Sequence, residues 1–165
     1  MGHGLDEGTT VGPLIDAGAV AKVERLLADA VAKGARVVVG GADAPRPSAA
    51  YFPPTVLTEV RPGMELLQEE VFGPVVPIAT FADEAEAIAV ANDTEFGLAA
   101  YVFTGDAARG QRVAAALRFG HVALDSGTGP TPEAPFGGMK HSGYGREGGA
   151  EGVLEFVELQ TVPRR

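Results

Sequence analysis

The fold is decided by residues 98–124, LAAYVFTGDAARGQRVAAALRFGHVAL. Leu98–Phe103 is an apolar and aromatic run of strand length, Asp106–Phe119 has helical periodicity, and His121–Leu124 is a second short apolar run. A strand, a helix and a strand in this order predict a right-handed crossover between two parallel strands. We therefore expect an α/β fold with a parallel sheet.

The alternation begins before this stretch. Residues 75–81, VVPIATF, are expected to form a strand, and Pro77 places it at a sheet edge or a bulge because proline cannot donate a ladder hydrogen bond. Asp83, followed three residues later by Glu86, predicts a capped helix start. The α/β pattern therefore starts at about Val75.

The N-terminal part of the chain predicts one helix and two strands. An apolar stripe predicts a helix over Ala17–Lys33, with Asp16 as its N-cap and Gly34 ending it. The β-branched run 35–39 predicts a buried strand, and Thr55–Val60 predicts another. A surface loop rich in Ala and Pro is expected between these two strands.

The regular pattern stops after Asp125. Residues 126–149 contain eight glycines and three prolines, and a segment this long without periodicity is usually functional or mobile. Val153–Val162 is expected to form a last strand. A terminal strand of this kind is often an exposed edge that pairs with another strand.

The composition narrows the class of protein. A length of 165 residues predicts about one domain, and 45% hydrophobic with 21% charged residues predicts a folded chain. The net charge of −9 argues against nucleic acid or an anionic membrane as partner, because both need a basic face. No apolar run reaches the ~18 residues of a membrane span, and the N-terminus has no signal-peptide core, so a cytoplasmic protein is expected.

The sequence contains no cysteine, which limits the chemistry that these side chains can perform. A disulfide scaffold, a thiolate metal site and a cysteine nucleophile are all excluded on these residues. The three histidines are scattered, which argues against a metal site, and no G-x-S-x-G elbow occurs. Gly143–Gly148 matches G-x-G-x-x-G, but no strand precedes it, so a glycine-rich loop is the favoured interpretation over a dinucleotide fingerprint.

Residues 69–74, EEVFGP, place two carboxylates beside an aromatic ring and a stiff Gly-Pro turn. A carboxylate can accept hydrogen bonds from two adjacent hydroxyls, as on a ribose, and an aromatic ring can pack beside a flat heterocycle. The plainer interpretation is an acidic turn with a core phenylalanine. From the residue types alone, that plainer interpretation is favoured.

Three motifs in one order resemble the aldehyde dehydrogenase superfamily: Glu69–Val75 (EEVFGPV), Ala91–Ala100 (ANDTEFGLAA) and Pro135–Glu147 (PFGGMKHSGYGRE). The resemblance covers essentially the whole chain and is strongest to succinate-semialdehyde dehydrogenase. It implies that the chain is a fragment, the C-terminal third of such an enzyme. Residues 1–152 would then be part of the αβα parallel-sheet core of the catalytic domain, and residues 153–165 an oligomerisation strand and tail.

The resemblance also implies roles for individual residues. Glu70 would hold the hydroxyls of the nicotinamide ribose of NAD or NADP, and Phe72 would pack beside the nicotinamide. Phe136 would line the substrate cavity, and Thr131 would contact the distal carboxylate of a semialdehyde. Asp125 stands where relatives usually have Asn, and a buried charge there would be costly unless it is paired. The terminal strand would add to a neighbouring subunit's sheet and make a homo-oligomer.

In this family a cysteine thiolate attacks the aldehyde, hydride moves to NAD(P)+, and water hydrolyses the thioester. The resemblance places the cysteine and the glutamate base upstream of this segment, so no catalytic residue is assigned here. We expect the isolated chain to be inactive and to hold no cofactor tightly; a small aldehyde would be the substrate of a complete enzyme only. Two alternatives remain open: a non-catalytic assembly module, and one part of a split enzyme whose partner supplies the cysteine.

Overall fold

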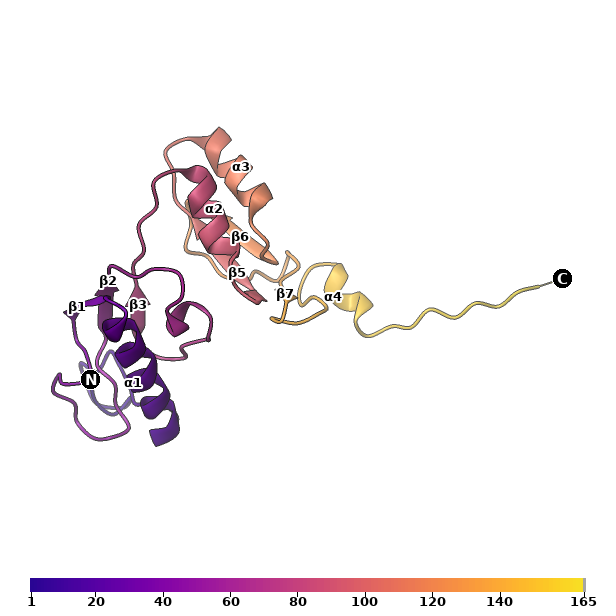
Figure 1. Ribbon diagram of the computed structural model, residues 1–165. Coiled ribbons are helices and arrows are strands. Elements are labelled where there is room, and N and C mark those ends of the chain that lie inside the picture. The colour runs from indigo at the N-terminus through magenta and orange to yellow at the C-terminus, as the bar shows by residue number, and fades with distance from the viewer. Residues whose placement is uncertain (165) are drawn as a thin grey trace. The chain divides into compact units, whose positions relative to one another are not determined.

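Two units, Met1–Phe81 and Ala82–Arg165, make up the computed structural model, which describes residues 1–164 (Figure 1). Strands β1, β2 and β3 form a sheet in the first unit, whereas the second unit holds two strand pairs, β4–β7 and β5–β6. Among the described residues, no sheet takes strands from both units. Each unit completes its own strand pairing, and the expectation of about one domain from length stays a prediction.

Helix α1 (Ala17–Ala32) is the scaffold of the first unit and confirms the helix predicted there. The Asp16 carboxylate accepts a hydrogen bond from the Ala19 N–H at 2.8 Å, as an N-cap does. Gly34 follows the helix with a φ of +100°, a left-handed conformation that favours glycine at this position. One face of the helix is buried; it consists of Val20, Val23, Leu26, Leu27 and Ala30.

The sheet of the first unit has the order β1 (Arg36–Val39), β2 (Thr55–Thr58), β3 (Val75–Pro77). Strand β1 runs antiparallel to β2, and β3 runs parallel to it. Pro77 lies on an edge strand, as its missing N–H predicts. The prediction that residues 35–39 are buried is wrong for residues 36–39, since all four residues of β1 are exposed. As an edge strand, β1 gives the core only Ala35, the residue just before it.

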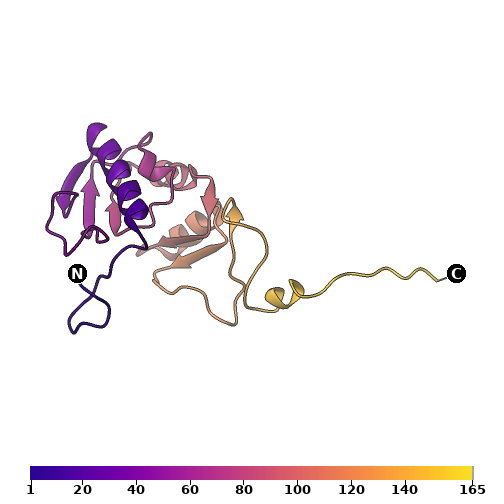
Figure 2. The ribbon, with the colours of Figure 1, turned by 90° about the horizontal axis from the view of Figure 1, so that it is seen from below.

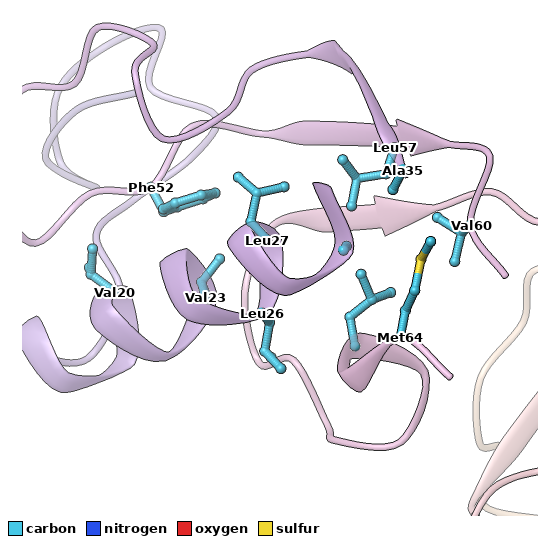
Figure 3. Packing of buried hydrophobic residues seen from close by; sticks show 11 residues of the cluster. Val20, Val23, Leu26, Leu27, Ala35, Phe52, Leu57, Val60 and Met64 are labelled. Carbon is cyan, nitrogen blue, oxygen red and sulfur yellow. The ribbon is translucent and has the colours of Figure 1, made fainter. Parts of the chain in front are cut away.

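The core of the first unit lies between α1 and β2. Figure 3 shows Phe52, Leu57 and Met64 packing against the apolar face of α1. Leu57 on β2 has no exposed surface, and Leu66 of the 3-10 helix η1 (Glu65–Leu67) is also buried in this cluster. The chain that follows η1 is therefore fixed close to α1.

The second unit contains the predicted crossover. Strands β5 (Ala99–Val102) and β6 (His121–Leu124) are parallel, with Ala99 opposite His121. Helix α3 (Ala107–Ala116) connects them and lies against the pair (Figure 2). It ends at Ala116, three residues before the predicted end.

Helix α2 (Glu84–Asn92) precedes this crossover. The Asp83 carboxylate accepts from the Glu86 N–H, and the Glu86 carboxylate accepts from the Ala82 N–H, so the predicted capped start is confirmed. The first bond satisfies a backbone donor that the first turn of the helix leaves open, and the second attaches the residue before the N-cap to the helix.

The C-terminal part differs most from the sequence prediction. Strand β4 (Phe96–Gly97) pairs antiparallel with β7 (Met139–Lys140), which lies inside the segment expected to be irregular. The strand predicted over Val153–Val162 is not formed: α4 (Glu151–Leu154) is a short helix, and residues 155–164 contain no strand (Figures 1 and 2). A strand needs a neighbour for its backbone groups, and no described strand pairs with this segment.

Candidate functional site

The acidic turn, residues 69–74, is fixed to helix α1 by charged side chains. Arg25 donates to both carboxylate oxygens of Glu69, at 2.9 and 2.7 Å, and also to Glu65. The hydrogen bonds that Arg25 donates to the Glu69 carboxylate are the main reason why the pKa of Arg25 is raised. Lys22 donates to the backbone carbonyl of Glu70. Both residues of the acidic pair are therefore attached to α1, Glu69 through its side chain and Glu70 through its backbone carbonyl.

A close packing contact completes this attachment. A Cβ added at Gly73 would come 2.6 Å from Cγ2 of Val23, a buried residue of α1. Only a residue without a side chain lets the turn approach the helix this closely. The Gly-Pro step thus sets the distance between the turn and α1.

The two side chains expected to bind a cofactor, Glu70 and Phe72, both face solvent. Glu70 is exposed, and its carboxylate has no hydrogen-bond or ion-pair partner in the described part of the chain. Phe72 is 75% exposed, and its φ of +44° is left-handed, so it is not a core phenylalanine. A free carboxylate and an exposed ring are both open to a ligand, the carboxylate as a hydrogen-bond acceptor and the ring as an apolar surface.

A cavity of about 790 Å³ lies in the second unit. Phe136 lines it together with Leu98, Tyr144, Arg146 and backbone of the glycine-rich segment. Phe136 exchanges two backbone hydrogen bonds of 2.7 Å with Glu147, which closes the loop between them. The mixture of aromatic walls and a few polar groups is typical of a small-molecule site.

The structure separates the two residues expected in the substrate pocket. Phe136 is half-buried and lines the cavity, whereas Thr131 is exposed and does not line it. The Thr131 carbonyl accepts a hydrogen bond from the Ala134 N–H at 3.3 Å, as part of a turn. Glu70 and Phe72 belong to the first unit, and Thr131 and Phe136 to the second.

Asp125 is not a buried charge, contrary to the concern raised by its sequence position. Its side chain is exposed, and its carboxylate accepts a hydrogen bond from the Thr104 N–H at 2.7 Å. Its φ of +51° is left-handed, a conformation that aspartate tolerates better than most residues. Asp125 thus ends strand β6 without a desolvation cost.

Two residues that the sequence did not single out fix the loops of the second unit. Lys140, which is half-buried, donates to the Thr94 carbonyl at 2.9 Å and lies 5.3 Å from the centre of the Phe119 ring. Asn92 donates to the Ala116 carbonyl and accepts from the Arg118 N–H, at 2.9 and 2.8 Å. Both residues lie within the quoted motifs, but only their long-range contacts reveal this role.

Other kinds of site find no support. Gly143–Gly148 follows the two-residue antiparallel strand β7, so it lacks the context of a dinucleotide fingerprint. Within residues 1–164, no group of three or more acidic or histidine side chains could hold a metal ion. In the same range, no helix has the length and apolar character needed to cross a membrane.

Comparison with known proteins identifies relatives over nearly the whole chain. A model described as "Aldehyde dehydrogenase family" matches residues 1–162. The chain is 50% identical over 162 residues to succinate-semialdehyde dehydrogenase [NADP(+)] GabD of Escherichia coli, covering 98% of this chain and 33% of that protein. It is 49% identical over 165 residues to glutarate-semialdehyde dehydrogenase of Pseudomonas aeruginosa, again with 98% and 33% coverage.

Solved structures agree. The crystal structure of an oxidoreductase from Marinobacter aquaeolei superposes with a TM-score of 0.90 and 59% identity, over 97% of this chain and 33% of that one. Betaine aldehyde dehydrogenase from Staphylococcus aureus, in complex with NAD+, gives a TM-score of 0.86 and 42% identity, over 94% and 31%. The chain spans about a third of the length of the curated relatives it matches.

Proposed function

Because the chain belongs to the aldehyde dehydrogenase family, we propose that it supplies one third of an NAD(P)-dependent enzyme that oxidises a semialdehyde to a dicarboxylic acid. Succinate semialdehyde is the favoured substrate. The supporting observation is the 50% identity to the E. coli succinate-semialdehyde dehydrogenase, sustained over 162 residues. The 49% identity to a glutarate-semialdehyde dehydrogenase supports the same substrate class, an aldehyde with a distal carboxylate.

We propose further that this third is the C-terminal one. Residues 1–152 would complete the catalytic domain, and residues 153–165 would form an assembly segment. The order of the three motifs and the absence of cysteine from all 165 residues support this placement. The nucleophilic thiolate would then lie on polypeptide that precedes the segment, or on a partner chain if the enzyme is split.

Each candidate residue has a definite task in this proposal. The free carboxylate of Glu70 accepts hydrogen bonds from the two ribose hydroxyls, and the exposed Phe72 ring excludes water beside the nicotinamide. Phe136 forms an apolar wall for the substrate chain, and Thr131 donates to its distal carboxylate. When bound, the nicotinamide cofactor supplies the hydride acceptor. Arg25, Lys22 and Gly73 hold the acidic turn in place.

The isolated chain is expected to make no product, because an aldehyde dehydrogenase reaction starts with attack by a thiolate. A chimera tests this proposal. The 162 matching residues of the E. coli enzyme are replaced by those of this chain, and NADPH formation from succinate semialdehyde is followed at 340 nm.

We expect turnover by the chimera and none by the 165-residue chain alone. A chimera that folds as the E. coli enzyme does, judged by its melting temperature and assembly state, yet makes no NADPH would refute the proposal. Saturable turnover by the isolated chain would refute the missing-thiolate argument. A chimera in which the E. coli cysteine nucleophile is replaced by Ala is the control for background reduction.

The C-terminal segment favours a second role, assembly with a further copy. Its apolar side chains are more than half exposed: Val153, Leu154, Phe156, Val157, Leu159 and Val162. Exposed apolar surface often marks a protein–protein contact. We propose that residues 153–165 pair with a neighbouring subunit. Sedimentation velocity should show an oligomer that dissociates in the Val157→Pro variant, because proline removes a strand donor. A monomer at all concentrations would refute it.

A further inference from the structure

We propose that His121 is a positioning residue for the pocket loop, residues 126–136, which carries Thr131 and Phe136. This inference rests on the proposed function, because it assigns the loop to the substrate pocket. His121 lies at the start of β6 and is half-buried. The contacts that the structure gives its side chain are edge-to-face contacts with two aromatic rings and a hydrogen-bond contact with the loop.

The sheet directs His121 away from helix α3. Alternate side chains of a strand point to opposite faces, so His121 shares its face with Ala123, whereas Leu124 lies on the other. A Cβ added at Gly110 of α3 would contact the Leu124 side chain at 3.7 Å, which places α3 on that other face. His121 therefore projects from the face that α3 leaves uncovered.

The pocket loop covers His121 on this free face. The His121 and Phe136 rings meet edge to face, with centroids 5.7 Å apart and an interplanar angle of 60°. Tyr101 on β5 makes a similar contact on His121, at 6.3 Å and 66°. Aromatic pairs prefer this edge-to-face geometry, which is favourable beyond the apolar area that it buries. The imidazole thus links the sheet to the cavity wall.

A hydrogen bond fixes the other end of the loop. The His121 Nε2 lies 3.3 Å from the backbone carbonyl of Thr128. A carbonyl oxygen can only accept, so Nε2 carries the proton in this contact. One side chain therefore holds both Thr128, three residues before Thr131, and Phe136, five residues after it.

The histidine makes both contacts because it supplies an aromatic edge and a ring N–H together. Substitutions can separate them. His121→Phe keeps a ring beside Phe136 and loses the donor, whereas His121→Gln keeps a donor and loses the ring. His121→Leu loses both. His141→Gln is the matched control, because His141 is exposed and contacts neither residue of the loop.

The first experiment is NMR spectroscopy of the 165-residue chain and needs no activity. With His and Phe ring labels, we expect nuclear Overhauser effects between the His121 and Phe136 rings. The Thr128 amide and carbonyl resonances should shift in His121→Leu and stay in place in His141→Gln. A folded chain without the ring contact, or with unchanged Thr128 resonances in His121→Leu, would overturn the inference.

The second experiment separates positioning from stability in the chimera. His121→Leu should raise the KM for succinate semialdehyde roughly three- to tenfold, the effect of one hydrogen bond, and leave kcat within about twofold. The KM for acetaldehyde, which has no distal carboxylate, should change by less than about twofold. His121→Phe and His121→Gln should give smaller shifts of the same kind.

A merely structural histidine would lower the melting temperature and change both KM values equally, or neither, and that result would overturn the inference. Failure of the proposed function can be told apart from failure of the inference about His121. If the unsubstituted chimera does not oxidise succinate semialdehyde, the proposed function fails, and the NMR contacts still decide whether His121 positions the loop.

Discussion

Replacing Gly73 by alanine should push the acidic turn away from helix α1. The new methyl group would lie 2.6 Å from Cγ2 of Val23, and Val23 is 1% exposed, so it cannot move aside into solvent. Overpacking of this kind costs about 1–3 kcal/mol. The backbone of Gly73 is not left-handed, so alanine also restricts the unfolded chain and regains about 0.4–1 kcal/mol. The expected net loss in the free energy of unfolding is about 1 kcal/mol.

The sign of the effect should reverse when Val23 is shortened. Val23→Ala alone removes two buried methyl groups and should cost about 1.5–2.5 kcal/mol at ~0.8 kcal/mol for each, plus a cavity term. In that background the alanine at position 73 enters the vacated space, and only the unfolded-state gain remains. Gly73→Ala should then be neutral or stabilising, which is a coupling of about 1–2 kcal/mol between the two sites.

The assay is urea unfolding of the four chains of this double-mutant cycle, followed by the methyl resonances of Leu26 and Leu57, which report the core of the first unit. Gly12→Ala is the control, because no atom lies within 4 Å of its added Cβ and its backbone is not left-handed. An equal effect of Gly73→Ala in both backgrounds would refute the contact with Val23. In the chimera, the same substitution should weaken NADP+ binding, because it displaces Glu70 and Phe72.

Three further substitutions test separate parts of the structure. Glu70→Gln in the chimera should raise the Kd for NADP+ roughly tenfold or more, the effect of losing a charge-assisted hydrogen bond, with an unchanged melting temperature; calorimetry measures the affinity. Lys140→Met should destabilise the second unit by about 1–2 kcal/mol in urea, because the Thr94 carbonyl loses its donor. The hydrogen bond from Lys33 lowers the pKa of Asp29, so this carboxylate stabilises the fold above the ordinary pKa of an aspartate. That contribution should be lost as the pH falls through the lowered pKa, and the chain with Asp29→Asn should show a smaller loss over the same acid range.

The parts of the fold that sequence predicts well are those with local causes. Helix α1 and the crossover through α3 follow from apolar periodicity and from caps at Asp16 and Asp106, each of which bonds a backbone N–H three residues later. Burial does not follow from local causes in the same way. The valines of β1 have the composition of a buried strand, but an edge position leaves them exposed, and edge position depends on the order of strands in the sheet.

Local sequence patterns predict the candidate site only in part, for the same reason. The motif around Glu70 and Phe72 is visible in the sequence, but the left-handed backbone that exposes Phe72 is set by contacts of its turn with α1. Lys140 and Thr94 are 46 residues apart, and no periodic pattern connects them. The strand expected over Val153–Val162 was inferred from composition and resemblance, and its pairing partner is not part of the local pattern.

The candidate residues of both units share one arrangement: an exposed or half-buried candidate side chain lies on a turn that other residues hold in place. Glu70 stands on a turn held by Lys22 and Arg25, and Phe136 on a loop closed by its backbone bonds with Glu147. The Glu70 carboxylate is exposed and contributes little to stability, so its replacement should affect binding alone. The residues beneath it contribute to both. Substitutions at the fixing residues should therefore change affinity and stability together, whereas substitutions at the functional groups should separate them.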